Sequence, residues 1–490
     1  MRTALVPSLL MLAAIAPALD SYTPGPRALG MGGAGTAVVD DHNAQFWNPA
    51  AFGFFAGAEG DKKLPSDNNA LGRKDWGFGL DANAGYQVQG ELADLVDKVS
   101  EIDWDKLGNN GTAQLSQQDI SDLATIADAI SSVGDPGNVV TATVTAGLGV
   151  RIGHFGLGVR AYGETGAIVT DTDLLNVALD VSGPVLAQEI VASGSASDGQ
   201  VQLFTSTQQA QLVTALGGGA SAVQAVAVLD FQARQAGVTS SQAQQVFTGL
   251  LNAAEGTGAN ISDNTTTVTL RGFGLIEVPL SYGHSIGEHF SVGGNLKFLV
   301  GRVYANSVPV FADSIEQSLQ DSLDTYQQTY NVGLDLAVMA RMRMLQVGLT
   351  GRNLNSPSFD GPTSSLGQKH ADVTIDPSLT LGAAFIPWET LAIAVDVDLL
   401  EYQDIMEVND TRRLGGGIEW NPYRVLALRL GAWKNLAESE QSPVITAGVG
   451  LNLWAVRVDL AAASTTEKVD IDGTEVPEQA QVSLGMMVDF

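Results

Sequence analysis

Fourteen segments of this chain alternate apolar and polar residues, and the connections between them alternate between short and long. In WGFGLDANAGYQ, which begins at Trp76, every second residue is apolar, and Gly, Asp, Asn or Gln fill the positions between. This two-residue period is typical of a β-strand with two different faces. The connection after every even-numbered segment has only a few residues, whereas the others run from the stretch 435–442 to the very long stretch 171–265. The expected strands are 76–87, 140–151, 155–170, 266–282, 289–304, 330–342, 344–353, 377–386, 390–401, 412–421, 424–434, 443–452, 454–465 and 480–490.

Alternation alone would also suit a soluble β-sandwich. A sandwich gives no reason for every long connection to lie at one end of the fold. A bacterial outer-membrane barrel does, because its periplasmic turns are short and its external loops are long. The pattern therefore predicts an all-β fold, a transmembrane antiparallel β-barrel of about 14 strands, with both termini in the periplasm.

The charges are distributed as a membrane barrel requires. The net charge is −29, and acidic residues outnumber basic residues by 30 in the long connections, so the rest of the chain is nearly neutral. Charged residues within the expected strands mostly fall on the polar face, since an unpaired charge facing lipid would cost about 2–4 kcal/mol near the bilayer centre. Arg302 departs from this pattern, and we expect it near a rim or at a bulge. So acidic a chain is not expected to bind nucleic acid.

Aromatic residues gather near the strand ends, as in the interfacial girdle of a membrane barrel. Phe490, the last residue of the final alternating segment, fits a C-terminal barrel signal. The girdle residues would be Trp388, Trp420, Tyr423, Trp433, Trp454 and Phe490.

The N-terminus has the features of a secretory signal. A basic residue at Arg2 precedes an apolar core at 4–14, and Ala16-Pro17-Ala18 forms a small-x-small cleavage site. The chain contains no cysteine, which excludes a lipid-anchored cysteine, a disulfide framework and thiol redox chemistry. No uncharged apolar run of membrane-spanning length follows the signal, which excludes a helical membrane protein.

Two long connections have helical spacing of apolar residues. One contains ELADLVDKVSEIDWDKL and SQQDISDLATIADAISSV, and the other is the Ala/Gln-rich stretch 207–254, broken at Gly217-Gly218-Gly219. We expect helical extracellular loops that cover the barrel mouth. The five histidines form no evident catalytic or metal-ligand pattern, so we expect no enzyme activity, no metal and no cofactor.

The stretch RALGMGGAGTAVVDDHNAQFWNPAA begins at Arg27 and contains a formal G-x-G-x-x-G at Gly30, Gly32 and Gly35. A dinucleotide-binding turn needs a buried strand before the first glycine and a helix after the last. Pro24-Gly25-Pro26 cannot form a central strand, and TAVVDDHN is too short for the helix. A flexible Gly/Ala-rich segment would explain the glycines but leaves the aromatic NPA segment unexplained.

The glycine-rich block, the NPA segment, the fourteen-strand pattern and the terminal Phe together resemble the FadL-type outer-membrane transporter superfamily. Within it, the chain is similar to the branch catalogued as TraF-type conjugal-transfer proteins. The resemblance implies an N-terminal hatch in the barrel lumen and passive transport of small hydrophobic, fatty-acid-like molecules. It places the hatch motif at Gly30, Gly32, Gly33, Gly35, Asn48, Pro49 and Ala50.

The resulting domain organisation is a signal peptide at 1–18, a hatch at 19–75 and a barrel at 76–490, with long extracellular loops at 88–139 and 171–265. Aromatic residues beside the NPA turn would contact a hydrophobic ligand or, equally, wedge the hatch in place. These residues are Phe46, Trp47, Phe52, Phe54 and Phe55.

The expected partners are outer-membrane lipid, the barrel-assembly machinery and a hydrophobic small-molecule ligand. A competing interpretation makes the chain a surface interaction protein for assembly or conjugation, with no transport role. In that case the acidic external loops would bind a protein partner.

Overall fold

The computed structural model describes most of the expected barrel and part of what fills it. The described ranges are 23–55, 76–89, 139–171, 183–236, 265–309, 325–363, 369–403, 410–423, 425–439, 441–453, 455–471 and 474–489, with a few single positions between 238 and 251. The expected signal peptide, the first long external loop and Phe490 lie outside these ranges.

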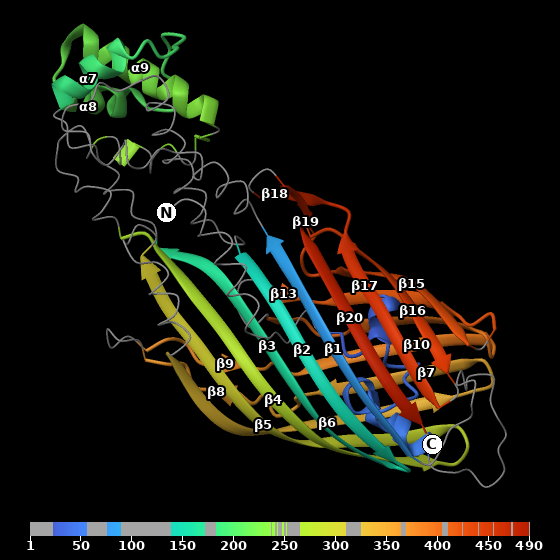
Figure 1. The fold of residues 1–490 in the computed structure, drawn as a ribbon. Coiled ribbons are helices and arrows are strands. Elements are labelled where there is room, and N and C mark those ends of the chain that lie inside the picture. Colours follow the sequence, from blue (N-terminus) through green and yellow to red (C-terminus); the bar gives the residue numbers. More distant parts are fainter. Residues whose placement is uncertain are drawn as a thin grey trace.

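The strands form one closed antiparallel barrel in chain order, and β1 pairs with β20 to complete the wall (Figure 1). The barrel strands are β1 (Trp76–Gln89), β2 (Val139–Ile152), β3 (Phe155–Asp171), β4 (Thr267–Ile286), β5 (Phe290–Pro309), β6 (Tyr326–Arg341), β7 (Leu345–Arg352), β10 (Ser378–Trp388), β11 (Leu391–Asp398), β14 (Arg413–Trp420), β15 (Leu426–Asn435), β16 (Val444–Leu453), β17 (Val456–Thr465) and β20 (Gln479–Asp489). All fourteen predicted strands are present, so the predicted fold class is confirmed.

The strands beyond the barrel are short hairpins in the long connections. They are β8 (Ser358–Phe359) with β9 (Val373–Thr374), β12 (Tyr402–Gln403) with β13 (Asp410–Thr411), and β18 (Lys468–Ile471) with β19 (Thr474–Pro477). The wall itself is uneven, because β4 and β5 have 20 residues each whereas β7, β11 and β14 have 8. The side formed by β3 to β6 therefore rises well above the opposite side (Figure 1).

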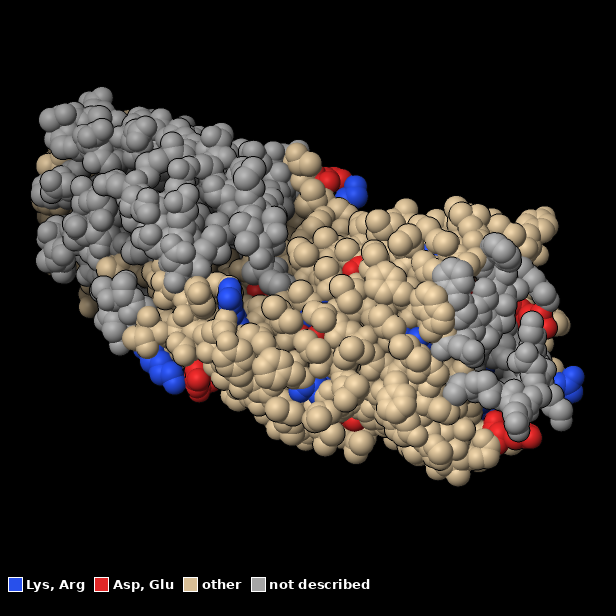
Figure 2. Space-filling view, turned by 60° about the horizontal axis from the view of Figure 1, so that its bottom comes forward, with Lys and Arg blue, Asp and Glu red and all other residues tan. Residues whose placement is uncertain are grey.

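The alternation places apolar side chains outside and polar side chains in the lumen. In β1, Leu80 is exposed on the outer surface while Asp81 is buried inside. Lys, Arg, Asp and Glu are sparse on the described part of the wall in Figure 2. Arg302 does point outward, where its Nε donates to Gln328 Oε1 at 2.8 Å and its guanidinium lies 5.0 Å from the Tyr326 ring centroid. These contacts with polar and aromatic groups, near the start of β6, show how a charge is accommodated on this face.

The girdle prediction was wrong for one aromatic residue. Trp388, Trp420 and Tyr423 are exposed, as expected for an outer girdle. Trp433 instead faces the lumen and is only 8% exposed, because its ring lies 4.1 Å below the Arg413 guanidinium.

The connection between β3 and β4 carries a helical unit at one end of the molecule (Figure 1). Its helices are α7 (Gly183–Ala192), α8 (Ser206–Ala215) and α9 (Gly219–Ala236), and they share a core that includes Ile190, Leu212 and Val226. The predicted break falls at Gly217–Gly219, where all three glycines have positive φ. In the part of the chain that the structure describes, no helix combines the length and hydropathy needed to span a bilayer.

Residues 23–55, which we call the lumenal segment, run inside the barrel (Figure 1). The segment contains α2 (Pro26–Gly30), α3 (Ala44–Trp47) and the 3-10 helix η1 (Pro49–Phe54). The helix α2 contacts β15, β16, β17 and β20, whereas η1 contacts β4, β5 and β6 on the taller side of the wall. The segment thus touches opposite sides of the barrel.

Candidate functional site

The NPA turn starts the 3-10 helix η1. Asn48 is its N-cap, with extended backbone, and Asn48 Oδ1 accepts a hydrogen bond from the Ala50 amide at 3.0 Å. Pro49 occupies the first helical position, where its missing N–H costs nothing and its fixed φ favours the helix. The Asn48 side chain also donates to Thr36 O at 3.1 Å, which ties the turn to the preceding part of the segment. Asn48, Pro49 and Ala50 therefore form the start of η1 through local hydrogen bonds and a favourable backbone conformation.

The glycine-rich turn needs glycine for conformation and for space. Gly32 and Gly33 have φ of 66° and 78°, in the left-handed region that side chains disfavour. A Cβ on Gly32 would also lie 2.7 Å from the Ala432 backbone nitrogen and collide with the carbonyl oxygens of the wall. The Gly32 amide donates to Thr446 Oγ1 at 3.1 Å, and the Gly35 amide donates to Asp396 Oδ2 at 2.9 Å. Both backbone amides therefore donate hydrogen bonds to side chains of the wall. Such bonds are expected where a chain segment packs against the wall.

Glycines in the wall face the glycines in the segment. A Cβ on Gly417 would lie 2.6 Å from Met31 Cα, and one on Gly448 would lie 3.2 Å from Gly30 Cα. On the opposite side, a Cβ on Gly283 or Gly293 would lie 2.5 Å from a backbone nitrogen of η1. The segment thus rests its backbone directly on the wall. The wall glycines that face backbone atoms of the segment are Gly283, Gly293, Gly348, Gly382, Gly415, Gly417, Gly431 and Gly448. Those that face only its side chains are Gly79, Gly149, Gly156, Gly158 and Gly485.

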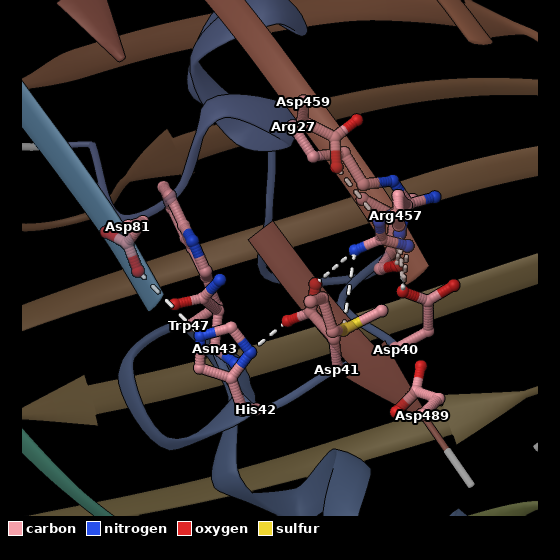
Figure 3. A network of polar contacts seen from close by, with 12 residues as sticks. Arg27, Asp40, Asp41, His42, Asn43, Trp47, Asp81, Arg457, Asp459 and Asp489 are labelled. Carbon is pink, nitrogen blue, oxygen red and sulfur yellow. Dashed lines mark hydrogen bonds and ion pairs between the residues drawn. The ribbon is translucent and has the colours of Figure 1, made fainter. Parts of the chain in front are cut away.

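The first part of the segment, residues 23–43, is held by buried ion pairs, and we call it the charged half (Figure 3). Arg27 donates to both carboxylate oxygens of Glu419 at 2.9 Å, and also to Asp40 Oδ1 at 2.9 Å. From the wall, Arg457 pairs with Asp41. Two-bond contacts of this kind combine charge with fixed geometry.

The ion pairs extend into the wall and shift the titration of the segment. Arg429 bridges Glu419 and Asp459, at 2.7 and 2.6 Å. Burial opposes the charged guanidinium of Arg27, but the carboxylates of Asp40 and Glu419 outweigh it and raise the Arg27 pKa. Burial likewise opposes the charged Asp41 carboxylate, yet Arg457 holds the Asp41 pKa below its usual range.

The second part of the segment, residues 44–55, is the aromatic half. The Phe46 ring lies 3.9 Å from the guanidinium of Arg160, Phe54 lies 4.9 Å from that of Arg341, and Phe55 lies 4.9 Å from that of Arg151.

Neutral contacts complete the packing of this half. Phe52 is fully buried, packs edge-on against Phe55 at 5.4 Å and covers Gly156 of the wall. Trp47 donates its indole N–H to Pro24 O at 2.8 Å. All five candidate ligand residues are thus in contact with the protein itself in this conformation.

A small cavity lies between the charged half and the wall. It has a volume of about 30 Å³ and is lined by residues that include His42, Trp47 and Asp81. That volume suits one or two water molecules, whereas a cavity that binds benzene measures about 150 Å³. This cavity therefore has no room for a hydrophobic ligand, and a ligand bound at this place would have to displace part of the segment.

Beyond the lumenal segment, the lumen face of the taller side of the barrel, β3 to β6, changes from charged to mainly apolar side chains. A polar layer comes first, in which Lys297 Nζ lies 2.9 Å from Asp335 Oδ1 and 3.4 Å from Glu277 Oε2. The next lumen-facing positions along β4 and β5 are apolar, whereas on β3 Tyr162 is followed by the buried Glu164, which pairs with Phe273 in the sheet. This apolar layer comprises Tyr162, Phe273, Leu275, Leu299 and Val303, covered by Phe359, Val373 and Ile375 from the β7–β10 connection.

The family described as "F plasmid transfer operon, TraF, protein" matches residues 45–398. The chain belongs to this family. The resemblance predicted from the sequence is thereby confirmed. No curated protein matches the chain.

Solved structures of similar overall form are distant in sequence. The Ralstonia pickettii toluene transporter TbuX is 11% identical, with 95% of this chain and 98% of that chain covered and a TM-score of 0.44. A Pseudomonas aeruginosa FadL homologue is 10% identical, with 97% and 100% covered and the same TM-score. The P. putida toluene transporter TodX is 11% identical, with 96% and 98% covered, also at 0.44.

Sequence reasoning missed the wall side of this site. It named the glycines and aromatics of the segment but not Asp396 and Thr446, which accept from the glycine amides. It also did not predict that Glu419 and Arg457 pair with Arg27 and Asp41. It also missed the apolar layer. One available signal was the run of lumen-facing glycines in the strands, since a lumen face without side chains indicates that another backbone lies against it.

Proposed function

We propose that this chain is an outer-membrane channel through which small hydrophobic molecules cross passively, with the lumenal segment closing its lumen. The apolar layer on the lumen face of β3 to β5 carries this proposal. A barrel that conducts ions or sugars lines its lumen with polar side chains. Apolar side chains inside the lumen favour cargo that gains free energy by leaving water.

The outer surface agrees with a membrane location. Large apolar side chains such as Leu296, Leu334, Leu430 and Leu484 are more than 40% exposed on the described wall. Exposed apolar surface this extensive marks a membrane or protein contact in most proteins. A barrel has no free strand edge, so its backbone hydrogen bonds are satisfied inside lipid.

Uptake by cells tests the proposal. Bacterial cells that carry the chain in their outer membrane should take up radiolabelled toluene and a labelled long-chain fatty acid faster than cells that lack it. The folded state of the barrel would be checked by its heat-resistant mobility on a gel. Uptake equal to that of the control cells, with the barrel folded, would refute the transport proposal.

The helical unit in the β3–β4 connection favours a second function. The helical unit α7–α9 has a hydrophobic core separate from the barrel, and Asp230, fully buried, accepts hydrogen bonds from the Gln202 and Leu203 amides at 3.0 and 2.8 Å. Transport alone does not require such a folded external unit, which suits a protein-binding platform for surface assembly or conjugation. Removal of 186–255 should then abolish partner capture or conjugal transfer while uptake continues. Normal transfer after this deletion would exclude the platform.

A further inference from the structure

We infer that Arg302 and the tyrosines around it bind the phosphate group of a lipid on the outer face of the barrel. This site depends on the membrane location of the barrel and not on transport. Arg302 differs from the arginines inside the barrel, because no carboxylate pairs with it among the residues that the structure describes. Carboxylate partners are present for four lumen-facing arginines, which are Arg151, Arg160, Arg429 and Arg457.

The guanidinium of Arg302 lies among uncharged groups of β5 and β6. Its Nε donates to Gln328 Oε1 at 2.8 Å, and Gln328 Nε2 donates to the Tyr330 hydroxyl at 2.7 Å. The guanidinium also lies 5.0 Å from the ring centroid of Tyr326, which packs against the ring of Tyr304 at 5.4 Å. These contacts orient the side chain, and the bond to Gln328 uses only its Nε–H. The two terminal nitrogens carry four of the five N–H donors of a guanidinium and can bind a phosphate through two parallel hydrogen bonds.

The outer surface of β4 leaves room for a phosphate beside Arg302. The β4 residues that pair with Arg302 and Tyr304 are Gly274 and Gly272, so neither carries a side chain there. Among the described residues, a Cβ at Gly274 would have a neighbour within 4 Å only in Tyr304, at 3.8 Å. Arg302 is itself exposed. A phosphate can therefore approach the guanidinium from the β4 side.

The height of Arg302 on the wall matches the level of lipid head groups. On β5, the outward residues from Phe290 to Val300 are apolar or glycine. At a rise of about 3.3 Å per residue and a strand tilt of about 40°, this stretch spans about 25 Å, which is the height of the apolar band of an outer-membrane barrel. Arg302 is the first outward residue of β5 beyond this band, on the side of the long connections. It therefore lies where the head groups of the adjoining leaflet are expected.

The apolar surface next to the cluster favours a lipid phosphate over free phosphate. Phe298 and Val332 pair in the sheet, and the Phe298 ring stacks on that of Tyr330 at 6.1 Å. Phe298 and Val332 are half exposed on the outer face. The acyl chains of a lipid whose phosphate binds Arg302 would cover these side chains, and burial of this apolar surface is favourable. Inorganic phosphate has no group that could make these contacts.

Native mass spectrometry of the purified full-length chain in detergent, titrated with diphosphoryl lipid A, tests this inference. Arg302→Gln should bind this lipid about fivefold more weakly than the native chain, which is the effect expected of one cation at a lipid surface. Arg302→Lys should recover part of the loss, because it keeps the charge without the planar fork. Arg343→Gln is the matched control, since it removes an exposed arginine from the β6–β7 turn at the other end of the barrel, and it should bind like the native chain.

Two results of this titration would overturn the inference. One is native affinity in Arg302→Gln, with the barrel shown to be folded by its heat-resistant mobility on a gel. The other is an equal loss in Arg302→Gln and Arg343→Gln, which would mean that the lipid responds to net charge and not to a site.

Two further probes separate a lipid phosphate from other ligands. Lipid A without its phosphates should bind the native chain and Arg302→Gln equally, because only acyl and sugar contacts remain. Inorganic phosphate at the concentration of the lipid should not displace diphosphoryl lipid A. Displacement by inorganic phosphate, or a loss for the phosphate-free lipid as large as that for diphosphoryl lipid A, would overturn the inference. If the chain fails to increase toluene uptake but the binding pattern holds, the lipid site stands and the transport proposal fails.

Discussion

The two halves of the lumenal segment are held by different forces. The charged half is fixed by ion pairs such as Arg27–Glu419, and breaking one side of a buried pair costs about 3–5 kcal/mol. The aromatic half is held by ring packing, by cation–π contacts worth about 0.5–2 kcal/mol each, and by hydrogen bonds that Ser291, Asn295 and Thr350 of the wall donate to its backbone carbonyls. A hydrophobic cargo can replace ring contacts but not ion pairs. We infer that the charged half is the firmer anchor, and that the aromatic half, which is held to the wall by neutral hydrogen bonds and ring contacts, is the part that would move in the proposed transport.

A reversible lock on the aromatic half should have the largest effect. A side chain added at Gly53 would meet Ser291 Oγ of β5 and would also lie 2.8 Å from backbone atoms of His284 and Ser285. Cysteines at positions 53 and 291 can therefore form a disulfide if η1 shifts slightly away from β4, and the chain has no other cysteine. Under oxidation, the Gly53→Cys, Ser291→Cys variant should lose nearly all toluene uptake, and a reductant should restore it. Each single variant serves as the control. Native uptake in the oxidised double variant would show that the aromatic half stays in place.

Loosening the anchor comes next. Glu419→Ala leaves Arg27 and Arg429 without their shared carboxylate and should destabilise the seated charged half by about 3–5 kcal/mol. Single-channel recordings in a planar bilayer should then show frequent opening, because the segment leaves its seat. Glu475→Ala removes an exposed pair with Lys468 and should change nothing. A silent recording from Glu419→Ala would mean that the ion pairs are not what holds the segment.

Larger side chains in the glycine-rich turn test the charged half by steric clash, with its ion pairs left intact. Valines at Gly32 and Gly33 would have unfavourable positive φ and would collide with the wall or with Arg413. Each strained position costs about 1–3 kcal/mol, and the closed wall should remain heat-resistant because its hydrogen bonds are unaffected. Conductance should rise or become noisy. Unchanged, silent conductance would count against this seating of the segment.

Lowering the pH should weaken the seating of the charged half only below about pH 4. The folded-state pKa of Asp41 is lowered, so the stabilisation from ionised Asp41 is complete above its unfolded pKa of about 4 and disappears as pH falls through the lowered value. Conductance should thus be steady from neutral pH down to about 4 and should rise below it. Asp41→Asn should already be leaky at neutral pH and should lose this part of the pH response. An identical pH profile in both proteins would contradict the assignment.

Trimming one ring of the aromatic half should have the smallest effect. Phe54 is half-buried, and its main described ring contact is with Arg341. Phe54→Ala should remove about 0.5–1 kcal/mol and raise toluene uptake by a few-fold at most, with no ion leak. Toluene uptake through the Phe54→Leu variant should lie between that of the native chain and that of Phe54→Ala. A leak as large as that of Glu419→Ala would erase the distinction between the halves.

The sequence predicted the wall better than its contents. Strand positions follow from local alternation, which is visible in a window such as Trp76–Gln87 and needs no partner. The contacts of the segment cannot be read this way, because Arg27 and Glu419 are 392 positions apart and nothing local links them. Within the wall, Trp433 shows where local prediction fails. Its position near a strand end suggested the girdle, but its register in β15 places it in the lumen under Arg413. The hatch boundaries and the ligand role of the five aromatics stay predictions.

The glycine-lined wall also sets an order of events. Arg27 and Gly32 are made early, but their seats at Glu419, Gly431 and Thr446 belong to strands made near the end of the chain. Until those strands arrive, the beginning of the chain has nothing to rest on. In the closed barrel, in which β20 pairs with β1, the segment lies in close contact with the wall on opposite sides, and little space is left for late entry. We therefore expect the wall to close around residues 23–55 rather than to admit them after closure.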